Sequence, residues 1–363
     1  MNNVYREVPF SGRPSYEFHT GEDYFDALSS DIDAQQTGGV SISTLGFDPS
    51  DLRVLKVTEA LRSAANRGLD TSLTVDNFSV LDKTKLGLLG NAFDTRRDAL
   101  GGLRRSGVKT GYSNYPSIGS FYPMIPSGVY SGRSHIKSAV VGDKLYLGGI
   151  SLDATDRLDA MVAFKNPLLA MNVAFLNQMA AVSSVKRVLA NKDHVFSFDK
   201  EMDAKLLVDA GVRGRSVIFN EALSIVDEAE EEVIYASEQF PNGKIGKHLL
   251  RAFERGVDVK IAVNHPNSHD RYRFAHKAIL DWAKRKYPAE FFANQLSEDA
   301  PTLHTKAIAS ESRAMVGSHN LNTIGVNLGT AELDVVSSDP DFIEGTRDLV
   351  LGQIKDNAAD LST

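Results

Sequence analysis

The chain has 363 residues, of which 42% are hydrophobic and 24% charged, a composition typical of a globular protein with two domains of ordinary size. Its formal net charge of −7 argues against sequence-independent binding to DNA, which requires clustered lysine and arginine side chains. The chain contains no cysteine, which excludes disulfides, thiolate zinc sites and cysteine nucleophiles.

Two apolar signals are missing from the sequence. Residues 1–16 are polar and lack the apolar centre of a signal peptide. No stretch reaches the roughly 18 uninterrupted apolar residues of a membrane span. We therefore expect a cytoplasmic protein. The most apolar region, residues 168–182, follows Pro167 and predicts a buried helix, with a helix lying in a membrane interface as the alternative.

The two halves of the chain predict the same order of elements. The first half predicts a helix over 25–34, a strand over 40–45, a helix over 54–66 and a strand over 71–76. The second half predicts a helix over 219–229, a strand over 232–236, a helix over 245–254 and a strand over 257–264. Each second helix ends in Arg-Gly, and the register holds, since 256 − 68 and 264 − 76 both equal 188. This repeat predicts two α/β units with largely parallel sheets between helices, the first in residues 1–200 and the second in residues 201–363.

The halves differ in one insertion. Asp76 lies 59 residues before His135, whereas Asn264 lies 40 residues before His304, so the first half carries about 19 more residues here. Residues 111–130 are rich in glycine, proline, serine and aromatic side chains, which predicts an ordered loop. A loop at this place can form a lid that shapes the substrate site, and a purely structural insertion is the alternative.

A short motif occurs once in each half. His135-Ile136-Lys137 and His304-Thr305-Lys306 are each followed by a glycine 11 residues after the lysine (148 − 137 and 317 − 306). The pattern predicts a strand, a tight turn and a returning strand. Because residues i and i+2 of a strand share one face, the histidine and the lysine of each motif should point the same way.

Two histidines and two lysines that converge on one cleft suit the chemistry of a phosphodiester. The lysines neutralise the charge that develops on the phosphate oxygens. One imidazole attacks phosphorus and forms a covalent phosphohistidine, while the other protonates the leaving oxygen and then activates the incoming alcohol or water. No metal or other cofactor is required, and each histidine needs a carboxylate that fixes its tautomer.

With these motifs the chain resembles the phospholipase D superfamily, whose signature is His-x-Lys, an acid, and Gly-Ser-x-Asn, present twice. The second copy matches at His304, Lys306, Glu311, Ser318 and Asn320, and Glu332 resembles the acid that orients a histidine. The first copy matches at His135, Lys137 and Gly149, with Ser151 in the asparagine position and Asp159 as the counterpart of Glu332. The motif acid of the first copy is replaced by Gly142, with Asp143 beside it, and the interval from lysine to glycine is one residue longer than usual in both copies.

The resemblance implies a fold and roles. The fold would be two similar α-β-α sandwich domains related by pseudo-two-fold symmetry, with mixed, mostly parallel sheets. His135 would be the nucleophile and His304 the general acid, with the reverse assignment as the alternative. Ser151, Ser318 and Asn320 would bind the substrate phosphate. His319 would line the pocket, and a metal site at His265, His269 and His276 is a minor alternative.

Within the superfamily, the halves look most like cardiolipin synthases. The implied reaction transfers a phosphatidyl group from a substrate such as phosphatidylglycerol to an alcohol, and water as the acceptor would give phospholipase D activity. The protein would act at the membrane surface as a peripheral protein, with aromatic residues of the 111–130 loop inserted into lipid. Nucleic acid is not the favoured partner, but a metal-independent nuclease is the second hypothesis, and a non-catalytic lipid-binding relative is the third.

Overall fold

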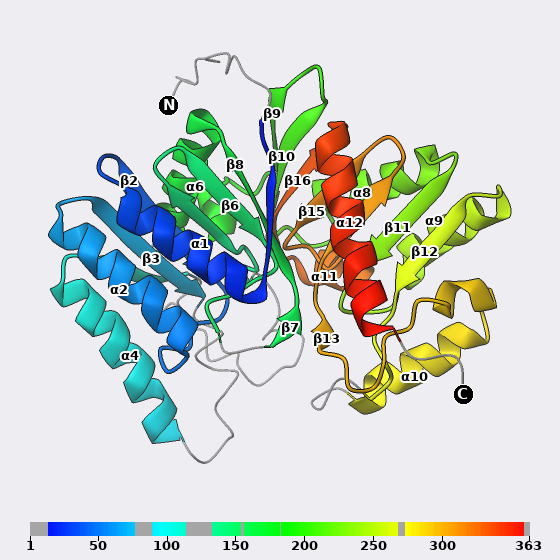
Figure 1. Ribbon diagram of the computed structural model, residues 1–363, viewed down its shortest axis with the longest axis horizontal. Coiled ribbons are helices and arrows are strands. Elements are labelled where there is room, and N and C mark those ends of the chain that lie inside the picture. The colour runs from blue at the N-terminus through cyan, green and yellow to red at the C-terminus, as the bar shows by residue number, and fades with distance from the viewer. Residues whose placement is uncertain are drawn as a thin grey trace.

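The computed structural model describes residues 14–76, 89–113, 133–153, 156–181, 183–267 and 273–358. Two seven-stranded sheets lie side by side, one from each half of the chain (Figure 1). Their strand orders are β1-β8-β6-β5-β2-β3-β4 and β12-β11-β14-β15-β16-β10-β9. If the second order is read in reverse and β10 is aligned with β1, the two orders coincide except at the edge strands β4 and β9. The predicted fold of two similar domains related by a pseudo-two-fold axis is therefore confirmed.

The strands of the first sheet are β1 (Glu17–Thr20), β2 (Gly39–Thr44), β3 (Asp70–Asp76), β4 (Lys109–Ser113), β5 (Ser138–Val141), β6 (Lys144–Gly148) and β8 (Ala160–Lys165). Those of the second sheet are β9 (His194–Asp199), β10 (Ala204–Ala210), β11 (Glu232–Ala236), β12 (Asp258–Ala262), β14 (Ala307–Ser310), β15 (Ala314–Gly317) and β16 (Ala331–Ser337). A separate two-stranded sheet pairs β7 (Arg157–Leu158) with β13 (Thr302–Leu303).

The helices of the first half are α1 (Gly21–Ala34), α2 (Leu52–Asn66), α4 (Leu89–Arg105), α6 (Pro167–Ala180) and α7 (Val185–Val188). Those of the second half are α8 (Val217–Glu228), α9 (Gly243–Glu254), α10 (Arg273–Lys284), η1 (Ala289–Phe292), α11 (Thr323–Leu328) and α12 (Pro340–Asn357). Within the described residues, none of these helices is long and apolar enough to cross a membrane.

The repeated elements predicted from the sequence are present in both halves as α1, β2, α2 and β3, and as α8, β11, α9 and β12. Local chemistry sets their ends. The Asp51 carboxylate accepts a hydrogen bond from the Arg53 N–H at the start of α2, and the Ser216 hydroxyl accepts one from Phe219 at the start of α8. After α2 and α9 the chain turns at Gly68 and Gly256, whose φ angles of +86° and +93° favour glycine.

The sheets are mixed, as predicted, although the parallel part is smaller than expected. Strands β2, β3 and β4 pair in parallel, and so do β11 and β12. All other neighbours in the two sheets are antiparallel, including the hairpins β5–β6 and β14–β15. The reason is that each His-x-Lys motif enters a tight hairpin, which reverses the chain without a crossover helix.

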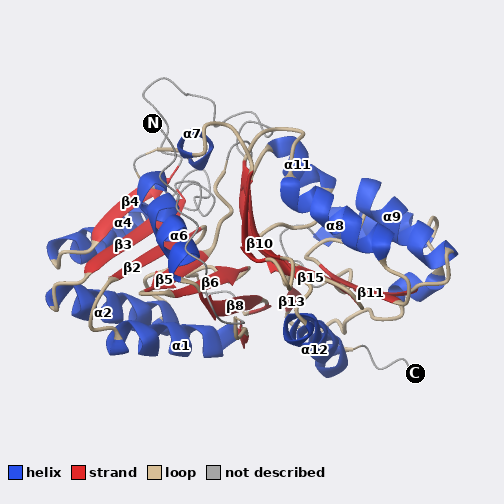
Figure 2. Cartoon of the chain, turned by 90° about the horizontal axis from the view of Figure 1, so that it is seen from above, coloured by secondary structure: helices blue, strands red, loops and turns tan. Residues whose placement is uncertain are grey.

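Each sheet is covered by helices on both faces (Figure 2). In the first half, α1 and α2 cover one face and α6 the other; in the second half, α8 and α9 cover one face and α12 the other. Successive residues of a strand alternate between faces, so Tyr146 joins the core under α1 and α2 while its neighbours Leu145 and Leu147 point the opposite way.

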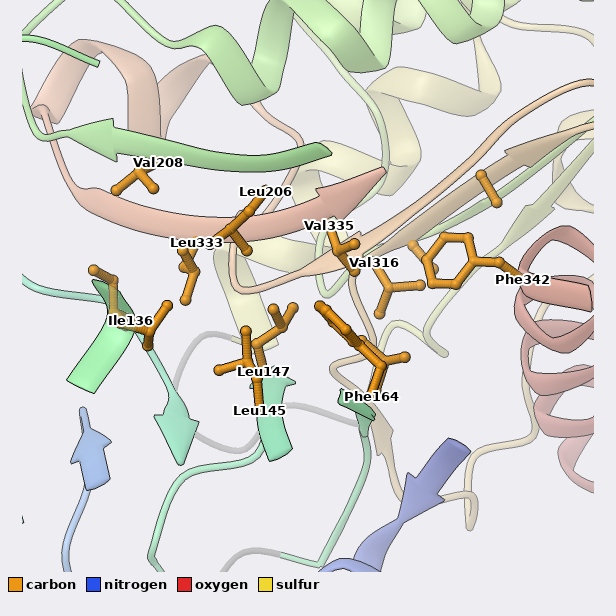
Figure 3. Close-up of a cluster of buried hydrophobic side chains, with 14 of the residues drawn as sticks. Ile136, Leu145, Leu147, Phe164, Leu206, Val208, Val316, Leu333, Val335 and Phe342 are labelled. Atoms are coloured by element: carbon orange, nitrogen blue, oxygen red, sulfur yellow. The ribbon is translucent and has the colours of Figure 1, made fainter. Parts of the chain in front are cut away.

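A third core joins the two halves. Leu145, Leu147 and Phe164 of the first sheet belong to the same buried cluster as Leu333 and Val335 of the second (Figure 3). All five side chains are fully buried. Burying such a side chain contributes about 1.5–3 kcal/mol, so this cluster holds the halves in a fixed arrangement.

Three regions differ from the sequence prediction or extend it. Residues 111–113, expected in a loop, belong to β4, which extends the first sheet beside β3, and α4 precedes it; residues 114–132 lie outside the described part. Strand β9, before residue 200, already pairs with β10 of the second sheet. The helix predicted after Pro167 is α6; one face packs on the sheet, while Met171, Phe175 and Met179 on the other are 58%, 55% and 37% exposed.

Candidate active site between the two halves

Both His-x-Lys motifs lie where the two halves meet, and each is attached by its backbone to the opposite half. The His135 N–H donates to the Ala331 carbonyl at 2.8 Å, and the Ala331 N–H donates to the Arg133 carbonyl at 2.8 Å. In the same way, the His304 N–H donates to the Leu158 carbonyl at 2.7 Å. Ala331 and Leu158 each directly precede a predicted orienting carboxylate, so these contacts bring each acid to the other half's histidine.

A polar residue at the end of β3 and another two residues after β12 hold the residue before each histidine. The Asp76 carboxylate accepts a hydrogen bond from the Ser134 N–H at 3.0 Å. The Asn264 side chain accepts from the Leu303 N–H at 2.7 Å and donates to the Leu303 carbonyl at 3.0 Å. In both halves, therefore, the polar residue that follows the repeated helix and strand fixes the backbone at the start of a His-x-Lys motif.

His135 is oriented by Glu332 of the second half. The Nδ1 atom of His135 lies 2.9 Å from Oε2 of Glu332 and 2.9 Å from the Ser318 carbonyl oxygen. A carbonyl oxygen can only accept, so Nδ1 carries the proton. The Nε2 atom of the neutral ring then holds the lone pair, which is the tautomer that a nucleophile or base requires.

His304 is oriented by Asp159 of the first half. Its Nδ1 atom lies 2.5 Å from Oδ2 of Asp159. The hairpin registers make Asp159 and Glu332 equivalent, because Gly148 lies opposite Met161 and Gly317 lies opposite Asp334. Each half therefore supplies the carboxylate for the histidine of the other half, and neither half contains a complete site.

The two lysines lie beside their histidines, as the i, i+2 spacing predicts. Nζ of Lys137 donates to the His135 carbonyl at 2.8 Å. Nζ of Lys306 lies 2.9 Å from Nδ1 of His304 and also donates to the His304 carbonyl. Both lysines are 1% exposed. Burial, together with the charge of Lys306, lowers the pKa of Lys137 to about 7.

Burial also shifts the pKa values of the other titratable groups of the site. Burial and Lys306 lower the pKa of His304 well below its ordinary value, and burial lowers that of His135. Burial raises the pKa of Asp159. Burial also acts to raise the pKa of Glu332, but the charge and hydrogen bond of His135 outweigh it and hold that pKa at about 2. Glu332 is therefore an anion at neutral pH.

The glycine and serine positions make room for carboxylates and hold them. A Cβ atom on Gly149 would overlap the Asp159 carboxylate, and one on Gly317 would overlap Asp334. The Ser318 hydroxyl donates to Glu332 at 2.6 Å and accepts from the Leu333 N–H at 3.0 Å, so it fixes Glu332. The Asn320 Oδ1 atom has no hydrogen-bond partner among the described residues.

Ser151 lies in a hollow beside His304. The hollow is lined by the backbone or side chains of Ser151, Asp153, Arg157, Asp159 and His304, together with Arg53 and neighbouring residues of the first half. Ser151 is nearly buried in this position. Arg53 and Arg157 of this hollow are thus two further cations beside the two lysines of the motifs.

Two acids at the site were not predicted from the sequence. Asp334 is buried and accepts hydrogen bonds from the Ser318 and His319 N–H groups at 2.9 and 3.1 Å, which fixes the Gly-Ser-x-Asn turn. Oε2 of Glu238 lies 3.8 Å from Nε2 of His304. Strand alternation puts Asp334 on the same face as Glu332, two residues earlier, and this was the signal available for it. The sequence gave no such signal for Glu238.

Other candidate residues have structural partners or fall outside the described residues. Glu311 accepts hydrogen bonds from the N–H groups of Glu230, Glu231 and Glu232, so it is a structural cap. Nδ1 of His319 accepts from Leu321, which leaves Nε2 without a partner in the described structure, and burial lowers the His319 pKa to about 4. His265 is in a turn, while His269 and the His276 side chain lie outside the described residues. Among the described side chains, no group of three or more acids and histidines could hold a metal ion.

A comparison with family models gives a match in the second half. The model described as "Cardiolipin synthase, PLD-like domain" matches residues 223–349, which include the second His-x-Lys motif and Glu332. No curated protein sequence matches the chain.

Solved structures share the fold over most of the chain. Phosphatidylserine synthase from Haemophilus influenzae Rd KW20 has 12% identity and a TM-score of 0.70, covering 94% of this chain and 86% of that chain. Polyphosphate kinase from Porphyromonas gingivalis has 13% identity and a TM-score of 0.57, covering 94% of this chain and 50% of that chain. Nuc from Salmonella typhimurium, a phospholipase D family member, has 19% identity and covers 46% of this chain and 94% of that chain, but its TM-score of 0.33 is too low to establish a shared fold. At these identities the first two likenesses establish the fold and nothing more.

Proposed function

We propose that this chain, a member of the phospholipase D superfamily, transfers or hydrolyses the phosphatidyl group of a phospholipid through a covalent phosphohistidine. One observation carries the proposal: two imidazoles, that of His304 buried and that of His135 partly buried, are each held at Nδ1 by a carboxylate of the opposite half and lie beside two buried lysines. The match of residues 223–349 to a cardiolipin synthase domain and the fold shared with a phosphatidylserine synthase support a phospholipid substrate.

The reaction proceeds in two displacements. In the first, Nε2 of His135 attacks phosphorus, the P–O bond to the leaving alcohol breaks, and His304 donates a proton to that oxygen. Burial lowers the pKa of His304 in the free protein, so His304 takes up this proton when the anionic phosphate binds beside it and raises its pKa. In the second, neutral His304 removes a proton from the incoming alcohol or water, whose oxygen attacks phosphorus and breaks the N–P bond. Lys137 and Lys306 neutralise the equatorial phosphate oxygens in both transition states, and Asn320 and Ser151 add polar contacts.

Glu238 supports His135 as the nucleophile and His304 as the acid. Ser43 pairs with the residue after Lys137, and Ala236 pairs with the residue after Lys306, so Ser43 and Ala236 are equivalent. Two residues further along each strand, the counterpart of Glu238 in the first half is Leu45. Among the residues that the structure describes, the Nε2 atom of His304 pairs with a carboxylate, at 3.8 Å, and that of His135 does not. A negative charge there favours the protonated imidazole that an acid needs. It would also repel an anionic phosphate from a nucleophile at that position.

The acceptor decides the product. With phosphatidylglycerol as both donor and acceptor, the product is cardiolipin; with water as the acceptor, it is phosphatidic acid. The proposed place of action is the cytoplasmic surface of a membrane, where a peripheral protein meets this substrate. A metal-independent nuclease remains the second candidate, because the same histidines can act on any phosphodiester.

The test is turnover of phosphatidylglycerol vesicles in EDTA, followed by mass spectrometry of the lipids. The wild-type protein should form cardiolipin or phosphatidic acid, while His135→Ala and His304→Ala should lose at least about 1,000-fold in rate. His248→Ala is the matched control: His248 on α9 pairs with Asp227 on α8, away from the site, so this variant should leave the rate unchanged. No turnover of any phospholipid, with cleavage of single-stranded DNA or RNA instead, would replace this proposal by the nuclease.

A further inference from the structure

The surface of α10 takes no part in the reaction above. Trp282 is the only tryptophan of the chain, and 40% of it is exposed. It lines a hollow together with Ala278 and Ile279 of α10 and with Asn242 and Gly243 at the start of α9. On the opposite face of α10, Leu280 and Ala283 are fully buried in the core of the second half. Part of the Ile279 side chain also packs against this core, so Trp282 and Ala278 are the apolar side chains of the hollow that α10 exposes.

This hollow lies close to the active site along the chain and in space. Asn242 follows by four residues Glu238, the carboxylate beside His304. Gly243 approaches Thr323 at the start of α11, since a Cβ atom on Gly243 would lie 3.0 Å from the Thr323 hydroxyl. Thr323 follows Asn320 by three residues. The Trp282 hollow is thus adjacent to segments that line the site.

Exposed cations follow the tryptophan in the sequence although the chain as a whole is acidic; Lys286 lies over the Trp282 ring, and Nζ of Lys284 lies 5.9 Å from the centre of the Phe292 ring. Lys284, Arg285 and Lys286 are consecutive and exposed, and Nζ of Lys286 lies 4.7 Å from the centre of the Trp282 ring. The acidic neighbours are Asp281, which pairs with Lys277 at 2.9 Å, and Glu290. Helix α9, whose first residues line the hollow, carries two more exposed cations, Lys244 and Lys247. The local charge is therefore positive in a protein whose formal net charge is −7.

We infer that this surface, formed by Ile279, Trp282, Lys284, Arg285 and Lys286, docks on an anionic phospholipid bilayer. An indole ring prefers the interface between water and acyl chains, and each lysine or arginine near an anionic leaflet adds to the attraction. Docking here would bring the active-site end of the second half to the lipid. The inference rests on the proposed function only for the choice of lipid, because binding requires no turnover.

The single tryptophan makes the test direct. The doubly inactive variant His135→Ala/His304→Ala is mixed with vesicles of phosphatidylglycerol and phosphatidylcholine, or of phosphatidylcholine alone. We expect Trp282 emission to shift to the blue and acrylamide quenching to fall with the anionic vesicles only, and less so at high salt. Because this variant cannot turn over lipid, binding without activity in the wild type would overturn the proposed function and leave this inference standing.

Charge variants separate this surface from the rest of the molecule. Lys284→Gln/Arg285→Gln/Lys286→Gln should weaken sedimentation with anionic vesicles by about 10- to 100-fold. Lys56→Gln/Arg62→Gln/Lys355→Gln makes the same change in net charge on α2 and α12 and should bind as before. Trp282→Phe should bind more weakly in the same sedimentation assay. The inference is overturned if the anionic vesicles bind without a change in Trp282 emission, if both triple variants bind equally, or if only a single-stranded oligonucleotide shifts the emission.

Discussion

At the residue scale, the two histidines differ in what their Nε2 atoms face. Both Nδ1 atoms lie against carboxylates, so the ring orientations are fixed alike, while Nδ1 of His304 also meets Nζ of Lys306. The difference comes from one position of the repeat, where Glu238 lies beside His304 and the first half has Leu45 instead. In the mechanism that we propose, this one asymmetric side chain in a symmetric frame divides the roles of nucleophile and acid.

This division can be tested with a leaving group that needs no protonation. On a phosphatidyl p-nitrophenol, His304→Ala should release about one equivalent of p-nitrophenol per chain and keep the phosphatidyl group on His135. The intact mass of the denatured protein should increase accordingly. His135→Ala should release none, and an adduct on His304 in that variant would show that the roles are reversed.

The pH dependence should reveal the lysine that burial perturbs. Burial and Lys306 lower the Lys137 pKa to about 7, so the free enzyme loses this cation as the pH rises through that value. We expect kcat/KM to fall above about pH 7. An anionic phosphodiester raises the pKa of the lysine it contacts, so kcat should fall only at higher pH. Rate profiles on a monomeric short-chain lipid measure both, and a kcat/KM that stays level from pH 7 to 9 would contradict the expectation.

At the scale of elements, the site depends on the core between the sheets. Phe164 of β8 is fully buried there and stacks on Phe198 of β9 with ring centres 5.3 Å apart. Phe164→Ala should cost about 3–5 kcal/mol of unfolding free energy. The same change loosens the contact between halves that aligns Asp159 with His304, so the rate should fall as well.

The control for this variant deletes an equally buried ring elsewhere. Phe291 lies in the core of the second half alone, and Phe291→Ala should cost a similar free energy of unfolding. Thermal denaturation compares the two, and lipid turnover well below both melting temperatures separates stability from alignment. Equal turnover in the two variants would show that the inter-sheet core does not set the geometry of the site.

The elements that the sequence predicts are those fixed by local chemistry. Apolar periodicity and the Arg-Gly turns give α1, β2, α2 and β3 and their repeats, because a turn with positive φ needs only its own glycine. The edge strands β4 and β9 were not predicted, since pairing with β3 and β10 decides them. Their sequences alone carry no comparable signal.

The same distinction between local sequence signals and tertiary contacts applies to the site. The motifs contain His135, Lys137, His304 and Lys306, and the spacing after each motif points to Asp159 and Glu332. The crossing of these acids to the opposite histidine depends on how the sheets dock, which no local pattern encodes. The same holds for Glu238, whose role follows only from its distance of 3.8 Å to His304.

At the scale of the whole molecule, one chain supplies both halves of its own site. The sheets follow one plan, yet each histidine takes its backbone partner and its carboxylate from the other half. A shared buried core joins the halves, so their pairing within a chain is part of folding. Two chains therefore need not exchange halves to become active.

Mixing two inactive variants tests this arrangement. His135→Ala and His304→Ala each damage one half, so a mixture would regain activity only if an intact first half from one chain met an intact second half from another. We expect no recovery of lipid turnover when the purified proteins are combined, because the inter-half core keeps each pair within its chain. Combining them before unfolding and refolding provides the positive control for exchange. Recovery without unfolding, up to about a quarter of wild-type activity for random pairing of halves, would mean that the active unit is a dimer with exchanged halves.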